Sequence, residues 1–189
     1  MRWAPLLAVI ALLCLPEAVL STPHEMLVNG DFEQEITVGW LQRLDASAAT
    51  LERTTTAQPD PDYELRLTVA NGVGTLAALQ RFLVPDPGMT VTADLCCSAA
   101  GSGGAWSAAG LVLTYRDRDW GSLGQTVIAA VSADCPWVDS PTFHLIAAVP
   151  GVWTHHAFEL LDELASLPGV DPDRVAWLEV AVLIEADNC

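Results

Sequence analysis

Acidic side chains recur at every second position in two short segments of the sequence. Two sets of three residues do so: Asp31, Glu33 and Glu35, and Asp60, Asp62 and Glu64. Carboxylate oxygens at such spacing are typical ligands of calcium. Neither segment is an EF-hand loop, because Ile36 and Leu65 stand at the sixth position, where that loop needs glycine. A solvated acidic loop is the alternative for both segments.

Asp117, Asp119 and Asp134 are the carboxylates to consider for glycoside hydrolysis, which needs an acid and a second carboxylate facing it. Their spacing sets up no such pair, and we expect solvated turn residues. The chain contains no lysine, which removes the P-loop, Schiff-base lysines and Ser–Lys nucleophile pairs. We therefore expect a protein that is not an enzyme.

Tryptophan offers a different chemistry, because a flat exposed ring can stack on the C–H face of a sugar. Trp106, Trp120 and Trp137 lie among Gly, Asp, Ser or Pro, which indicates loops. Packing of each ring against its own loop is the alternative. The other tryptophans beyond the first twenty-one residues are expected in the core, since they lie in or next to predicted strands: Trp40, Trp153 and Trp177.

The start of the chain has the order of a secretory signal peptide. Arg2 precedes an apolar run over residues 3–16, and small residues follow at the positions before a cleavage site. The run is shorter than the roughly 20 residues of a spanning helix. We expect residues 1–21 to be cleaved and residues 22–189 to form one secreted domain, extracellular or in the cell envelope, with no membrane span.

Four cysteines remain in that domain, and an even number in a secreted chain suggests two disulfides. Cys96 and Cys97 are neighbours in a predicted strand, so their side chains point to opposite faces and a bond between them is disfavoured. We expect each to pair separately with Cys135 or Cys189, in either order. Free buried thiols are the alternative.

The charge balance excludes one class of partner. The chain has 24 acidic residues and 8 basic ones, all arginine, for a net charge of -16. A nucleic-acid-binding protein needs a basic surface, so we expect no nucleic-acid partner.

The hydrophobic pattern predicts an all-β fold, a two-sheet antiparallel β-sandwich. Apolar and polar residues alternate over residues 63–69 and 89–97, the period of a half-buried strand. Residues 98–110 are rich in small residues and are expected to form a long loop. Further strands are predicted at residues 25–28, 50–54, 76–84, 111–115, 126–131, 143–148, 152–160 and 175–185, with one short helix at 160–167. Many short strands separated by turn signals are typical of a sandwich or barrel.

Several stretches resemble carbohydrate-binding modules of the families 4, 9, 16 and 22, which are galactose-binding-like jelly rolls. Asn29-Gly30-Asp31-Phe32-Glu33, followed by Gly39-Trp40, is similar to the opening of those modules. The other similar stretches follow in the family's order: residues 65–67, 80–84, 87–91 and 113–124. The resemblance spans nearly all of residues 22–189 and implies the jelly-roll form of the sandwich.

The resemblance also implies a site and a function. It implies structural calcium held by Glu33 and by Asp187 of the closing strand, and it adds Tyr115 of a central strand to the aromatic ligand-contacting residues. The expected function is a secreted, non-catalytic module that binds a polysaccharide or surface glycan. A neutral glycan is favoured, because the net charge repels polyanions at long range. The alternative is a structural or adhesive envelope domain without a sugar site.

Overall fold

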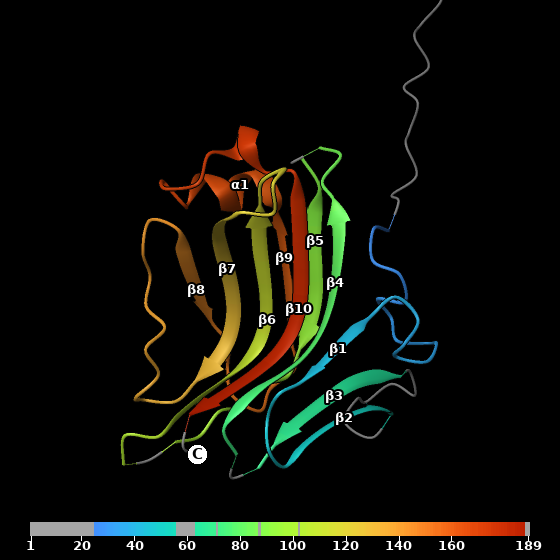
Figure 1. Cartoon of the computed structure of the whole chain (residues 1–189), viewed down its shortest axis with the longest axis vertical. Helices are drawn as coiled ribbons and strands as arrows, with labels where there is room; N and C mark the ends of the chain where they lie inside the picture. The colour runs from blue at the N-terminus through green and yellow to red at the C-terminus, as the bar shows by residue number, and fades with distance from the viewer. Residues whose placement is uncertain (1–24, 56–62, 71, 87, 102, 188–189) are drawn as a thin grey trace, which may run out of the picture.

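The computed structural model describes residues 25–55, 63–70, 72–86, 88–101 and 103–187 (Figure 1). The expected signal peptide and Cys189 lie outside these residues. The described chain is mostly β-structure and forms a β-sandwich. Its elements, in order, are β1 (Leu41–Leu44), β2 (Ala49–Thr54), β3 (Glu64–Val69), β4 (Gly74–Leu83), β5 (Thr90–Leu95), β6 (Trp106–Arg116), β7 (Ser122–Val131), β8 (Phe143–Ala147), β9 (Thr154–Glu159), α1 (Leu160–Ala165), the 3-10 turn η1 (Pro172–Arg174) and β10 (Trp177–Asp187).

Six strands form the large sheet, in the order β1-β4-β10-β6-β7-β8. The last strand of the described chain, β10, lies in its centre and pairs antiparallel with both β4 and β6. The edge strand β8 runs parallel to β7. A parallel pair needs a long crossover connection, and residues 132–142 supply it. The expectation of a purely antiparallel sandwich is therefore wrong at this edge.

Two small sheets, β2–β3 and β5–β9, form the second layer. Side chains from both cover one face of the large sheet, here called the inner face. On β10, Leu178 and Val180 belong to the core that includes β5, β9 and α1. Val182 packs against this core and also with Leu51 and Leu65 of β2–β3. The second layer is thus split into two pieces that cover different parts of one sheet (Figure 1).

The opposite face of the large sheet, here called the outer face, has no strand over it among the described residues. Side chains of a strand alternate between faces, so the register identifies which residues point outward. On β10 these residues are Trp177, Glu179, Ala181 and Leu183. The outer face is the surface on which the sheet can meet a partner.

The alternating patterns predicted most strands well. The expected strands at 50–54, 63–69 and 143–148 are observed as β2, β3 and β8, and the expected helix is α1. Residues 25–28 form no strand. Instead, the side chain of Gln80 takes the place of a strand partner: it accepts from the N–H of Val28 at 3.0 Å and donates to the Val28 carbonyl at 2.7 Å. The exposed edge strand β1 was not predicted.

The segment expected as a loop over residues 98–110 is also corrected, because β6 begins at Trp106. The small residues there are required by close packing within the sheet. A Cβ atom on Gly110 would lie 2.0 Å from the carbonyl oxygen of Ile128 on β7. The prediction of a loop therefore holds for the described residues 98–101 and 103–105, whereas residues 106–110 belong to a crowded strand.

Candidate binding site

A stacked pair of tryptophans lies where β10 begins. The rings of Trp120, in the β6–β7 turn, and Trp177, the first residue of β10, stack with centroids 4.7 Å apart and an interplanar angle of 29°. Trp120 is 41% exposed. The guanidinium carbon of Arg81 lies 5.5 Å from the centroid of the Trp120 ring, within reach of a cation–π interaction. We call Trp120, Trp177 and Arg81 the aromatic end of the outer face.

The backbone of Trp120 has an unusual conformation, with φ at +67°. A bulky non-glycine residue in the left-handed region costs roughly 1–3 kcal/mol and persists only when its surroundings hold it. The Trp120 N–H donates to the Asp117 carbonyl at 3.2 Å, and Arg116 Nη1 donates to the Trp120 carbonyl at 3.1 Å. The turn thus holds an exposed ring in place despite backbone strain, a pattern found at functional sites.

One carboxylate anchors the arginines beneath this stack. Glu179 on β10 accepts from Arg81 on β4 and, at 3.1 Å, from Arg116 on β6. Partial burial alone would raise the pKa of the Glu179 carboxyl, but the hydrogen bonds and charges of the two arginines outweigh it and lower that pKa below its ordinary value. Three neighbouring strands are therefore joined by charge at the outer face.

The other end of the outer face carries a second aromatic cluster. The ring centroids of Trp106 and Trp137 are 6.4 Å apart, and those of Trp137 and Phe143 are 6.2 Å apart in an edge-to-face arrangement. Both tryptophans are half-buried, and Trp137 packs against the apolar cluster around Val112. The rings of Trp106 and Trp137 are thus less exposed than that of Trp120, and their expected contact with a ligand stays a prediction.

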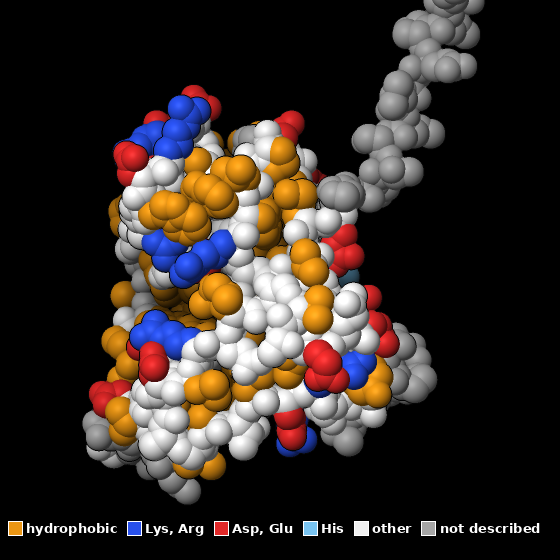
Figure 2. Space-filling view, turned by 45° about the vertical axis from the view of Figure 1, so that its right-hand side comes forward, with side chains coloured by type: hydrophobic (Ala, Val, Ile, Leu, Met, Phe, Trp, Pro, Cys, Tyr) orange, Lys and Arg blue, Asp and Glu red, His pale blue; other side chains and the backbone are white. Residues whose placement is uncertain are grey.

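Between the two ends, β6 runs for eleven residues, or roughly 35 Å at strand spacing. Polar groups lie on this stretch, where Gln125 Nε2 donates to Thr114 Oγ1 at 3.0 Å. Apolar side chains of Leu79 and Ala181 lie beside them on β4 and β10. Figure 2 shows arginine and hydrophobic side chains interleaved on the side it presents. The middle of the outer face thus carries both polar and apolar side chains.

Tyr115, expected to contact ligand, lies on the inner face instead. Its side chain is 0% exposed, and its hydroxyl lies 2.7 Å from Thr126 Oγ1. Thr126 donates to Glu163 of α1 at 2.6 Å, and His144 Nδ1 lies 2.6 Å from the same carboxylate oxygen. Burial raises the pKa of Tyr115 well above its ordinary value. Tyr115 is a core residue, and this network fastens α1 to β6, β7 and β8.

The expected calcium ligands lie apart. Glu33 Oε1 accepts from the N–H of Tyr63, just before β3, whereas Asp187 pairs with Trp106 at the far end of β10. Glu33 is therefore near the start of β3, whereas Gly74 and Asp187 are near the end of β3. The length of β3, about 20 Å, separates the two carboxylates. Within the described ranges, no group of three or more His, Cys, Asp or Glu side chains is arranged to hold a metal.

The first acidic motif has a structural role in the loop before β1. Buried Asn29 donates through Nδ2 to the carbonyls of Gln34, Glu35 and Val38, and its own carbonyl accepts from Trp40 Nε1 at 3.0 Å. The loop is therefore closed by the Asn29 amide and by the Trp40 indole.

The cysteines match the predicted faces but are free thiols here. Cys96 is exposed and Cys97 half-buried, as the alternation predicts, and neither they nor Cys135 form a disulfide with another described residue. Cys97 lies beside the backbone of Ala130, and Cys135 beside that of Trp137. Burial raises the pKa of both thiols. Because Cys189 lies outside the described residues, the two pairings stay a prediction.

Sequence reasoning missed Arg81 and Trp177, whereas it named Arg116 and Arg118 as possible partners for sugar hydroxyls beside Trp120. Trp177 follows Val175 and Ala176 in an apolar segment, which indicated a core strand. Arg81 and Glu179 are 98 residues apart and meet only because β4 and β10 pair. The one available signal was the Arg116-Asp117-Arg118-Asp119 run directly before Trp120.

Comparison with known proteins gives little beyond this geometry. No family model and no curated protein sequence matches the chain. Among the described helices, none is long and apolar enough to cross a membrane. The chain is similar in structure to a family 11 carbohydrate-binding module from Clostridium thermocellum, solved in complex with a β-1,3-1,4-mixed-linked tetrasaccharide, at 10% identity and a TM-score of 0.33, covering 84% of this chain and 89% of that chain. This likeness is too weak to carry an argument about the site.

Proposed function

We propose that the protein is a secreted, non-catalytic carbohydrate-binding module of jelly-roll type, which binds a glycan along the outer face of its large sheet. The observation that carries the proposal is the aromatic end: an exposed tryptophan, held at a positive φ and backed by a second tryptophan, above arginine side chains. A rigid ring of this kind suits the C–H face of a sugar, and the guanidinium groups suit its hydroxyls.

The stretches that resemble carbohydrate-binding modules favour the same function. The net charge of the whole chain, -16, also matters, because it repels a densely charged polyanion at long range. A glycan with a mostly neutral backbone fits both observations.

The test is a binding screen of soluble glycans against the exported protein, followed by titration of the best ligand with Trp120→Ala. Loss of a buried aromatic contact worth about 1.5–3 kcal/mol should weaken binding roughly 10- to 150-fold. Each titration is run with calcium and with chelator, since calcium bound through Glu33 is still proposed.

The matched controls are Trp106→Ala and Trp137→Ala, whose rings pack against each other. Both variants should have a lower melting temperature than the unaltered protein. The folded fraction of each should bind the glycan with unchanged affinity. No binding to any glycan in the screen, with Trp120 exposed and the protein folded, would favour the structural or adhesive alternative.

A further inference from the structure

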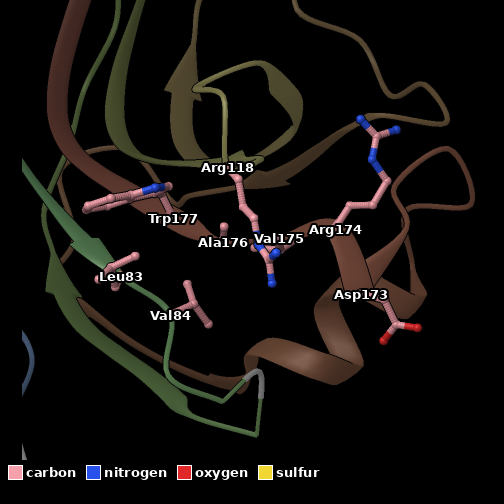
Figure 3. A pocket seen from close by; sticks show the side chains of 8 residues that line it. All are labelled: Leu83, Val84, Arg118, Asp173, Arg174, Val175, Ala176 and Trp177. Carbon is pink, nitrogen blue, oxygen red and sulfur yellow. The ribbon is translucent and has the colours of Figure 1, made fainter.

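A shallow hollow of about 390 Å³ lies next to the tryptophan stack, where three segments meet. The end of β4, the β6–β7 turn and the segment from η1 into β10 form its wall. Its lining residues include Leu83, Val84, Arg118, Val175 and Trp177 (Figure 3). The hollow is therefore continuous with the aromatic end through Trp177.

Arg118 is the charged side chain that reaches toward the middle of this hollow, between Val84 and Val175 (Figure 3). It makes no hydrogen bond or ion pair with any residue that the structure describes. Two carboxylates of the neighbouring segments already have arginine partners: Glu179 binds Arg116, and Asp117 Oδ2 accepts from Arg174 at 3.2 Å. Arg118 thus presents an uncompensated guanidinium.

Two other acidic residues nearby do not neutralise it. Asp173 lines the hollow, but its carboxylate points away from Arg118 in Figure 3. Asp119 is exposed in the β6–β7 turn, where its N–H donates to Asp117 Oδ1 at 3.0 Å. Asp117 itself is occupied further by the N–H of Gly121 at 2.8 Å. The turn therefore uses the Asp117 carboxylate to fix its own backbone, and Arg118 forms no ion pair with a described carboxylate.

The rest of the wall is apolar. Leu83 is 57% exposed, and the half-buried side chains of Val84, Val175 and Trp177 adjoin it. A ligand for this hollow needs one anionic group and an apolar face close to that group. Four of the chain's eight arginines, Arg81, Arg116, Arg118 and Arg174, lie at this end, and of these Arg118 is the one without a carboxylate partner among the described residues.

We propose that this hollow binds the carboxylate of an acidic sugar, a uronic acid unit in an otherwise neutral glycan, through Arg118. This inference rests on the proposed glycan-binding function and specifies its ligand. The planar guanidinium matches a planar carboxylate by two parallel hydrogen bonds. The C–H face of the same sugar lies against Leu83, Val84 and Trp177. Repulsion by the whole chain disfavours dense polyanions, so single carboxylates on a neutral backbone are the preferred targets.

The experiment is an NMR titration of the folded full-length exported protein with glucuronate, glucose and glucose 6-sulfate. These three sugars differ only in the group at one carbon, so they separate a carboxylate from a hydroxyl and from a sulfate. We expect glucuronate to bind at least about tenfold more tightly than glucose, and to shift the Arg118 Nε–H and Trp177 indole signals. Galacturonate and galactose repeat the comparison with a second sugar.

Arg118→Gln should remove the preference for glucuronate and leave the weak binding of glucose unchanged. Arg66→Gln is the matched control, because Arg66 is an exposed arginine on β3 that faces Glu52 at 4.0 Å, outside the hollow. It should retain the full preference.

Equal binding of glucuronate and glucose, or an unchanged preference in Arg118→Gln, would overturn the inference. Tighter binding of glucose 6-sulfate than of glucuronate would overturn the assignment to a carboxylate. In each case the glycan screen with Trp120→Ala tests the proposed function separately, since a neutral glycan would bind at the aromatic end without Arg118. Absence of binding by every sugar and every glycan would overturn both.

Discussion

The two ends of the outer face both carry close tryptophan rings, yet their surroundings differ. At the aromatic end, Trp120 is 41% exposed, and guanidinium groups lie around it. At the other end, Trp106 and Trp137 pack against each other and against Phe143 over an apolar cluster. Similar sequence surroundings therefore produce a surface available to a ligand at one end and an extension of the core at the other.

The difference has a local cause. Trp120 lies in the β6–β7 turn at a positive φ, while Trp106 is the first residue of the central strand β6. A ring on a strand has neighbours on both sides, but the element does not decide the exposure alone. Trp137 lies in the segment between β7 and β8 and still packs, because its ring contacts those of Trp106 and Phe143.

The largest effect that we expect comes from Trp137→Ala. Removal of a half-buried ring between Trp106 and Phe143 should cost about 2–3 kcal/mol of unfolding free energy, less than for a fully buried tryptophan. Thermal unfolding would show this as a melting temperature about 5–10 °C lower. Trp137→Phe should recover more than half of the loss. If Trp137→Ala melts like the unaltered protein, this ring does no packing and both ends are alike.

A smaller, pH-dependent effect is expected for Glu179→Gln. The pKa of Glu179 is lowered in the folded protein, so its contribution is present above the unfolded pKa of about 4.3 and disappears as pH falls through the folded value. At neutral pH the variant should lose about 1 kcal/mol, a discounted figure for a partly exposed group. Denaturant unfolding at pH 7 and at acidic pH measures it.

The control is Glu52→Gln, whose carboxylate faces Arg66 at 4.0 Å on the exposed surface of β2 and β3. That variant should change stability by only a few tenths of a kcal/mol at either pH. An equal loss at neutral and acidic pH in Glu179→Gln would mean that charge does not join the three strands.

The smallest expected change in stability is that of Trp120→Gly. Glycine relieves backbone strain of roughly 1–3 kcal/mol at φ +67°, which offsets most of the packing lost with the stacked, 41% exposed ring. Calorimetry should find the melting temperature within a few degrees of the unaltered protein, while glycan binding is lost. A drop as large as that of Trp137→Ala would place Trp120 among the core residues.

Alternation of apolar and polar residues was sufficient to predict most strands and the opposite faces of Cys96 and Cys97, because period-two burial is a local property. It failed for residues 25–28, where Gln80 supplies the hydrogen bonds from 52 residues away. It also failed for the start of β6, where tight contact with β7 selects small residues that resemble a loop.

The candidate site was predicted in part. Trp120 was identified from its turn residues, whereas Tyr115 was placed at the surface although its hydroxyl is committed to Thr126 in the core. The residues that distinguish the aromatic end, Arg81 and Trp177, are contributed by strand pairing across the sheet. No pattern of neighbouring residues predicts which distant strands pair. The sequence can therefore indicate an exposed tryptophan ring, but not the residues that surround it.

The most direct test is to record the tryptophan indole N–H signals of the folded protein while the best glycan of the screen is added. Exposure and charge at the aromatic end predict that the signals of Trp120 and Trp177 shift with saturation, while those of Trp106 and Trp137 stay in place. Shifts at Trp106 and Trp137 without a change at Trp120 would contradict the account, because the ligand would then bind at the packed end of the sheet.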